Sequence, residues 1–147
     1  MDVTAGARSQ APFPHRFVVA SVADMPPGSR RIVTIEGRSV GILNVGGRFY
    51  ALRNACPHQG APLCLGRVLP LATAERPFAI ELDSEHSIVK CPWHGWEFAL
   101  DTGRSVFNPH RTRVRAYDVS VGSPGEADVV LETYRVTVEG EAVIVHV

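Results

Sequence analysis

The chain contains two matched segments, CPHQG at residues 56–60 and CPWHG at residues 91–95. Each segment follows a run of residues typical of a β-strand and ends in a glycine, which permits a sharp turn. We therefore expect each to form the tip of a loop that presents one cysteine and one histidine. The four side chains are Cys56, His58, Cys91 and His94. Cysteine and histidine are scarce, with 3 and 6 residues among 147, so this double pairing indicates a single site built from both loops.

Two kinds of metal centre can use two sulfur and two nitrogen donors. Structural zinc sites usually pair like ligands at short spacing, as in Cys-x(2–4)-Cys and His-x(3–5)-His. Here the pairs are mixed, Cys-x-His and Cys-x-x-His, with 32 residues between them. A two-iron centre in which one iron takes both cysteines and the other takes both histidines suits this pattern. A Cys/His nucleophilic pair would leave the second loop unexplained. The residues thus favour the two-iron centre and leave zinc open.

The rest of the sequence predicts an all-β domain. Short runs rich in Val, Ile, Phe and Tyr alternate with glycine-containing turns, and no stretch has the apolar spacing of a helix over a helix length. The pattern is typical of a sandwich or a small barrel. The predicted strands are residues 17–22, 31–36, 39–45, 48–53, 79–82, 87–90, 97–100, 113–121, 129–138 and 142–147. Residues 68–85, which include two prolines, are expected to be extra length.

The two segments and the residues after them resemble the Rieske proteins, with CPHQGAPL at residues 56–63, CPWHGWEF at residues 91–98 and LDTGR at residues 100–104. The resemblance covers about residues 16–147. It implies one [2Fe–2S] cluster per chain, with solvent-facing imidazole edges as the electron exit. The ligands implied are the thiolates of Cys56 and Cys91 and the imidazoles of His58 and His94.

The same resemblance implies the architecture. In this family a β-sandwich base carries a small inserted cluster-binding subdomain, which corresponds here to about residues 54–104. Residues 16–147 would form the Rieske domain, and residues 1–15, which mix small and polar residues with two prolines, would be a flexible N-terminal tail. A proline-bearing loop commonly covers the cluster in this family, and residues 107–109 are the candidate.

Four positions indicate the branch of the family. Respiratory and photosynthetic members join the two loops by a disulfide, but the matching positions here are Ala61 and Trp93. Those members also place hydroxyl groups near the cluster, where this chain has Trp96 and Phe98. Because hydrogen bonds to cluster sulfur stabilise the reduced state, their loss predicts a potential toward the lower end of the family's range. The chain resembles the soluble, ferredoxin-like branch associated with oxygenases.

This branch implies an electron carrier that passes electrons from a reductase to a terminal oxygenase. An alternative is a Rieske component of a multi-subunit dioxygenase. A complete oxygenase would also need a mononuclear iron held by two histidines and one carboxylate, and no Asp/Glu-x-x-His-x(4)-His sequence occurs here. A further alternative is a zinc-binding or interaction module, since the small subunit of assimilatory nitrite reductases can keep the fold without the ligands.

Composition limits the partners and the location. Lys and Arg number 15 and Asp and Glu number 15, so no basic excess predicts a nucleic-acid partner. No apolar run approaches the ~20 residues of a membrane span, and residues 1–14 lack the apolar core of a secretory signal. With only 3 cysteines, we expect a cytoplasmic protein without a membrane anchor.

Four further residues near the site have expected roles. Cys64 lies in an apolar stretch, where a free cysteine behaves as a small hydrophobic side chain. His110 follows the candidate covering loop directly and could tune the cluster. Trp93 and Trp96 are expected to pack the cluster-binding subdomain, with contact to a partner as a second role.

Overall fold

The computed structural model describes residues 15–74, 80–123, 125, 129–130 and 140–147. Within these ranges the chain is all-β, apart from two short 3-10 turns, η1 (Val22–Asp24) and η2 (Leu63–Leu65). The all-β prediction is confirmed. The predicted tail of residues 1–15 lies outside the described residues except for His15, as does most of the predicted strand 129–138.

The larger sheet has seven strands in the described part of the chain, in the order β2-β3-β4-β8-β10-β1-β9. Neighbouring strands are antiparallel except for β1 and β9, which are parallel. The strands are β1 (Arg16–Ser21), β2 (Arg30–Ile35), β3 (Arg38–Val45), β4 (Arg48–Arg53), β8 (Ala116–Gly122), β9 (Val129–Val130) and β10 (Ala142–His146).

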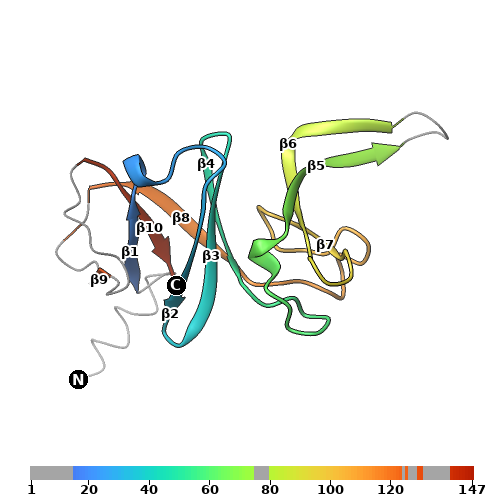
Figure 1. Cartoon of the computed structure of the whole chain (residues 1–147), viewed down its shortest axis with the longest axis horizontal. Coiled ribbons are helices and arrows are strands. Elements are labelled where there is room, and N and C mark those ends of the chain that lie inside the picture. The colour runs from blue at the N-terminus through green and yellow to red at the C-terminus, as the bar shows by residue number, and fades with distance from the viewer. Residues whose placement is uncertain (1–14, 75–79, 124, 126–128, 131–139) are drawn as a thin grey trace, which may run out of the picture.

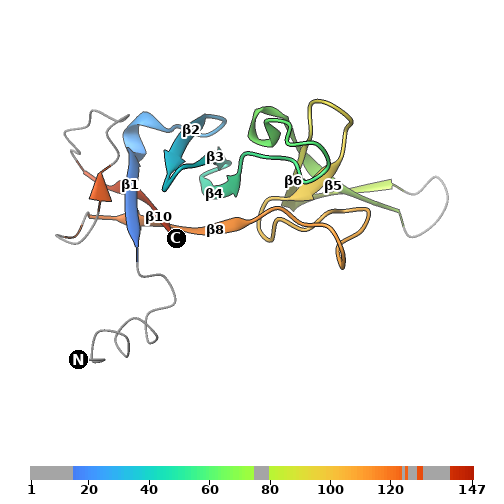
Figure 2. The same cartoon turned by 90° about the horizontal axis from the view of Figure 1, so that it is seen from below.

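This sheet folds over itself, as Figure 2 shows. Apolar side chains from β2 and β3, such as Val33 and Ile42, share one buried cluster with Val143 and Val145 of β10. Most of β3 and β10 is buried residue by residue, and β2 buries alternate residues at its end, so these strands supply the apolar faces that the fold encloses. The result is the sandwich-like base that was predicted.

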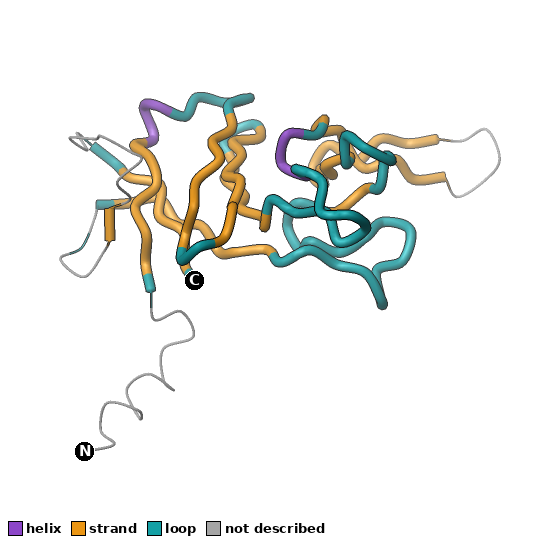
Figure 3. The backbone as a smooth tube through the Cα atoms, turned by 60° about the horizontal axis from the view of Figure 1, so that its bottom comes forward, coloured by secondary structure: helices purple, strands orange, loops and turns teal. Residues whose placement is uncertain are grey.

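A second, smaller sheet lies to one side of the base (Figure 1), in the order β5-β6-β7. Its strands are β5 (Arg67–Ala74), β6 (Ile80–Lys90) and β7 (Glu97–Ala99). The chain leaves the base at the end of β4 and returns at β8, so the small sheet and its loops form one excursion. Figure 3 shows the connecting loops gathered at this end of the molecule.

The segment of residues 68–85, expected to be extra length, contains a strand that the sequence did not predict. Most of this segment forms β5 and the first part of β6, and the two short strands predicted at 79–82 and 87–90 are one continuous strand. The ladder between β5 and β6 shifts register between Pro70 and Leu71. A proline can occupy a strand at such an irregularity on a sheet edge, because its missing N–H leaves no ladder bond unmade there.

The excursion is held against the base by η2 and the residues around it. One guanidinium nitrogen of Arg30 donates hydrogen bonds to the carbonyls of Cys64 (2.7 Å) and Gly66 (2.6 Å). The backbone N–H of Cys64 donates to the side-chain oxygen of Asn54 at 2.9 Å. A Cβ atom at Gly41 of β3 would collide with the Cys64 side chain. The two parts therefore meet in close contact beside the first cysteine loop, which lies between Asn54 and Cys64.

Candidate metal centre

The two cysteine loops have the same backbone hydrogen bonds. In each loop the cysteine N–H donates to the carbonyl five residues later, and the glycine N–H donates to the cysteine carbonyl. The bonds are Cys56 to Ala61 (2.8 Å), Gly60 to Cys56 (2.7 Å), Cys91 to Trp96 (2.7 Å) and Gly95 to Cys91 (3.0 Å). Gly60 and Gly95 both have φ of +76°, a conformation that side chains with a Cβ rarely adopt. Two strand ends thus carry two equivalent, rigid loop tips.

The two cysteines lie side by side in the interior. Cys56 and Cys91 are 2% and 3% exposed, and both belong to the apolar cluster beneath the loops. Burial raises the pKa of the Cys56 thiol, while N–H groups of His58 and Gln59 hydrogen-bond its sulfur and oppose the rise. A hydrogen bond with the Cys91 thiol and the charge of that group raise the pKa further. Two adjacent buried thiols can both lose their protons only if a positive charge lies between the two sulfurs. A bound metal supplies that charge and deprotonates its thiol ligands.

The two histidines lie side by side at the surface. The rings of His58 and His94 have centroids 4.8 Å apart and meet edge to face at 77°. Both residues are exposed, unlike the cysteines of the same loops. Each loop thus presents its sulfur inward and its imidazole outward.

The four donors therefore form two pairs of like atoms at different depths. Across the described ranges, no three His, Cys, Asp or Glu side chains converge as ligands of one ion do. Two inner sulfurs and two outer imidazoles fit a two-metal group in which one metal takes sulfur ligands and the other takes nitrogen ligands. All three cysteines are free, so no disulfide joins the loops.

Comparison with known proteins shows the family of the chain. Residues 15–118 match the Rieske [2Fe-2S] domain family. The chain belongs to the Rieske [2Fe–2S] family. Its cofactor is accordingly a Rieske [2Fe–2S] cluster, and the residues present fit that group.

Similar proteins include ferredoxins of dioxygenases. The 3-phenylpropionate/cinnamic acid dioxygenase ferredoxin subunit of Escherichia coli K12 is 32% identical over 108 residues, which cover 73% of this chain and 86% of that protein. The ferredoxin of carbazole 1,9a-dioxygenase from Nocardioides aromaticivorans IC177 is 25% identical, with a TM-score of 0.57 over 90% of this chain and 97% of that one. A chain assigned as the small subunit of an NADH-dependent nitrite reductase from Mycobacterium tuberculosis shares the fold, with 23% identity and a TM-score of 0.59 over 90% and 95% of the two chains.

An indole ring of this Rieske domain contacts one of the imidazoles. Trp96 stacks on His58 with ring centroids 4.3 Å apart and an angle of 11°. Trp96 is 37% exposed, and Trp93 is 57% exposed. Trp96 therefore packs against the first cysteine loop, as expected of it, although neither tryptophan is buried. The spacing of Trp96 from His94 gave no sign of the contact, because the stacked imidazole belongs to the other loop.

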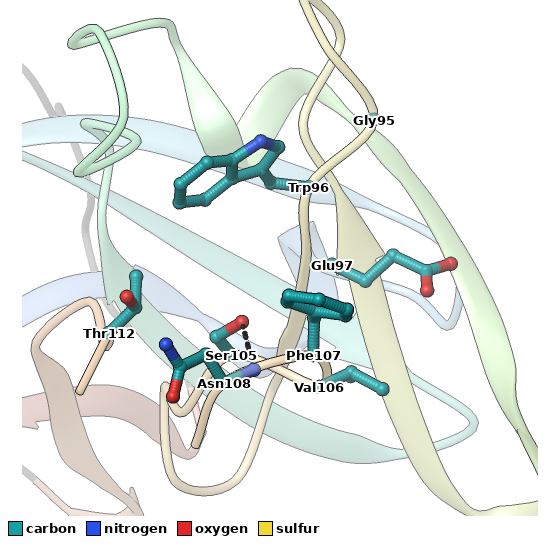
Figure 4. A pocket seen from close by; sticks show the side chains of 8 residues that line it. All are labelled: Gly95, Trp96, Glu97, Ser105, Val106, Phe107, Asn108 and Thr112. Atoms are coloured by element: carbon teal, nitrogen blue, oxygen red, sulfur yellow. Dashed lines mark hydrogen bonds between the residues drawn. The ribbon is translucent and has the colours of Figure 1, made fainter. Parts of the chain in front are cut away.

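A pocket lies beside the second loop, and Figure 4 shows its lining. Its volume is about 600 Å3. Trp96 and Phe107 stand on opposite sides of it, and Asn108 donates a backbone hydrogen bond to the Ser105 hydroxyl at 3.1 Å. The candidate covering loop thus lies next to the second loop, although Phe107 itself is 96% exposed. Coverage of the cluster by residues 107–109 stays a prediction.

The remaining candidate residues lie outside the donor pairs. Cys64 is fully buried, and its thiol donates to the carbonyl of Leu52 at 3.5 Å, as expected of a small side chain in an apolar core. Burial raises the pKa of Cys64 to about 12. His110 is exposed and lies with several arginines at a separate pocket. No helix in the described residues is long and apolar enough to cross a membrane.

Proposed function

We propose that this chain is a one-electron carrier whose Rieske cluster is held by Cys56, Cys91, His58 and His94. In this role it takes electrons from a reductase and delivers them to a terminal oxygenase. The observation that carries the proposal is the separation of the four donors by type, with sulfurs buried together and imidazoles exposed together. The names of the similar proteins, which are ferredoxins of dioxygenases, support the choice of partners.

The cysteines and the histidines of the site would have different roles in such a carrier. The buried Cys56 and Cys91 would hold the inner iron and keep water from it, since their loops rest on an apolar cluster. The exposed His58 and His94 would hold the outer iron and offer a short path to a partner. The cluster supplies one reversible electron when bound. Two neutral imidazoles in place of two thiolates make the site less negative by two charge units. A Rieske cluster is therefore easier to reduce than a cluster held by four cysteines.

The domain organisation and the location belong to the same proposal. Residues 54–104 would act as the cluster-binding subdomain on the base formed by the rest of residues 16–147. The apolar cluster that includes both cysteines supports this division, because it is largely separate from the core of the base. A cytoplasmic location is supported by the use of free thiols rather than disulfides.

Metal and sulfide analysis of the purified protein tests the proposal. We expect two irons and two acid-labile sulfides per chain. Cys91→Ala and His94→Ala should lose the cluster, whereas the matched controls Cys64→Ala and His110→Ala should keep it. One zinc per chain without sulfide would contradict the proposal and favour the zinc-binding module.

The oxygenase alternatives give different results in the same experiments. A third iron per chain would indicate a mononuclear site and an oxygenase activity of the chain itself. A permanent complex with a catalytic subunit would indicate a component of a multi-subunit dioxygenase. For a carrier that exchanges partners, we expect gel filtration to separate the chain from its oxygenase.

A further inference from the structure

The loop from Arg104 to Arg113 carries an exposed aromatic side chain beside the histidine pair. Phe107 is 96% exposed and Val106 is 39% exposed. Both line the pocket that Trp96 closes on its other side, and Trp96 stacks on His58. Exposed aromatic side chains therefore lie on both sides of this pocket, from the proposed electron exit to Phe107, together with the polar residues Glu97, Ser105, Asn108 and Thr112. Exposed apolar side chains gathered in this way mark interaction sites.

This loop is held in one shape by its own backbone. Arg104 and Arg113 face each other in an isolated antiparallel bridge, and the N–H of Ser105 donates to the carbonyl of Thr112 at 2.9 Å. The N–H of Thr112 also donates to the carbonyl of Asn108 at 3.0 Å. Phe107 thus lies on a loop whose backbone is already ordered. A partner that binds Phe107 would therefore lose little free energy to ordering of this backbone.

The same loop is strongly basic. A second pocket is lined by Arg104, Pro109, His110, Arg111 and Arg113, and its lining among the described residues includes no carboxylate. At the second cysteine loop itself, Arg67 and Lys90 line a third pocket together with Cys91 and Pro92. Cations therefore line a pocket at the second loop and another at the loop 104–113.

The charge near the loops differs from that of the whole chain. Residues 54–71 and 86–114 contain five Lys or Arg and two Asp or Glu, although the whole chain has 15 of each. One of the two carboxylates, Glu97, lies opposite Lys90 in the ladder between β6 and β7. The five cations and two carboxylates leave this part of the chain with a net charge of +3, whereas the whole chain has a net charge of zero. The loops therefore present a local excess of positive charge, and the arginines of the loop 104–113 contribute most of it.

We infer that Phe107 and the arginines at positions 104, 111 and 113 form the docking face for an acidic redox protein. The partner would surround an apolar hollow for Phe107 with carboxylates, and one electron would pass between its own redox group and the cluster behind His58 and His94. The basic loop would steer the encounter, and Phe107 would lie in the buried centre of the interface. The inference rests on the proposed function.

Electron transfer from an acidic plant-type ferredoxin tests the docking face. Such a ferredoxin has a potential of about −400 mV, so it can reduce a Rieske centre. One electron leaves the reduced ferredoxin and reduces this chain, and stopped-flow absorbance gives the rate. We expect the bimolecular rate to fall at least about tenfold between about 0.01 M and about 1 M ionic strength, as the Debye length shrinks from ~30 Å to ~3 Å. Oxidation of the reduced chain by basic cytochrome c should show the opposite salt dependence.

Two charge-reversed variants locate the effect. Arg111→Glu combined with Arg113→Glu should lower the rate with the acidic ferredoxin about tenfold at low salt and remove its salt dependence. Arg38→Glu combined with Arg48→Glu changes the net charge equally at exposed turns of the base and should leave the rate within about twofold. Phe107→Ala should lower the rate with the protein partner about fivefold but not the rate with the small oxidant hexaammineruthenium(III).

Three results would overturn the docking face. They are a rate with the acidic ferredoxin that does not fall as salt rises, equal losses in the two double variants, and an unchanged rate in Phe107→Ala. The EPR signal of the unmodified reduced protein is measured first, because its absence would refute the proposed function rather than the docking face. The salt dependence of the unmodified protein remains a complete test if a variant does not fold.

Discussion

The indole of Trp96 fixes one of the two outward imidazoles at the surface. The ring of His58 is exposed to solvent on the loop tip, and its contact with Trp96, 4.3 Å between centroids, restricts its rotation. Stacked aromatic pairs contribute about 0.5–1.5 kcal/mol beyond their buried area. Trp96 is thus a positioning residue for a proposed ligand.

Removing this stack should weaken retention of the cluster without preventing its assembly. We expect Trp96→Ala to lose iron to a chelator about 2–12 times faster than the unmodified protein. This range is the stacking free energy of about 0.5–1.5 kcal/mol converted to a ratio of rates. The EPR spectrum should also change, because the orientation of one nitrogen ligand is freed. Trp96→Phe should restore both properties, and Trp93→Ala is the matched control. Equal rates in Trp96→Ala and Trp93→Ala would show that the stack does not position His58.

The buried Cys64 thiol should make stability depend on alkaline pH. Its folded pKa of about 12 lies above the ordinary value of 9.0. Between these values the unfolded chain has lost the proton that the folded chain keeps, so the unfolded state binds fewer protons and stability falls as pH rises. We expect this group to lower the free energy of unfolding by about 1.4 kcal/mol per pH unit in that window. Denaturant titrations from pH 9 upward should give a steeper decline for the unmodified protein than for Cys64→Ala. Parallel declines would disprove this assignment.

At the scale of elements, the contact between β3 and η2 joins the base to the small sheet. A Cβ atom on Gly41 would collide with the Cys64 side chain, and the backbone around Cys64 is fixed by Asn54 and Arg30. Gly41→Ala should therefore destabilise the protein by about 1–3 kcal/mol. This corresponds to a fall of roughly 2–12 °C in the melting temperature. Gly122→Ala, with nothing within 4 Å of its added Cβ, should change the melting temperature little, and similar effects at both positions would refute the steric argument.

Most strands of the base could be predicted from short runs rich in Val, Ile, Phe and Tyr between glycine-containing turns, because such residues favour buried strands. β4 was predicted at its observed bounds, and β2 within one residue at each end. β5 could not be predicted in this way. Pro70 reads as a break in a strand, and only the position of β5 at a sheet edge, with a register shift beside the proline, makes it compatible. That position depends on pairing with β6, which the local sequence does not specify.

The candidate site was predictable to a different degree for different residues. The spacing of cysteine and histidine predicted four candidate donors, and the structure brings them together as a buried pair of cysteines and an exposed pair of histidines because each loop repeats the same short backbone pattern. The stack of Trp96 on His58 and the exposure of Phe107 could not be predicted, since both depend on how separate loops meet in space. The basic field was hidden by the equal totals of acidic and basic residues.

At the scale of the whole molecule, the surroundings of the cluster predict its potential. Phe98 is fully buried and Trp96 is stacked on an imidazole, so neither supplies the hydroxyl that high-potential members place there. We expect a potential near the lower end of the Rieske range, about −150 mV. Phe98→Tyr should raise the potential by restoring a hydroxyl, whereas Phe49→Tyr in the base should not change it. A redox titration of the unmodified protein that gives a value well above zero would contradict this reasoning.

The division of the four donors by type is the basis of the whole account. Pulsed EPR of the dithionite-reduced protein, labelled with nitrogen-15 at histidine, measures that division most directly. We predict one unpaired spin per chain, coupled to two histidine nitrogens and lost in His58→Ala. A reduced protein that is EPR-silent, or whose signal shows no coupling to histidine nitrogen, would contradict the account.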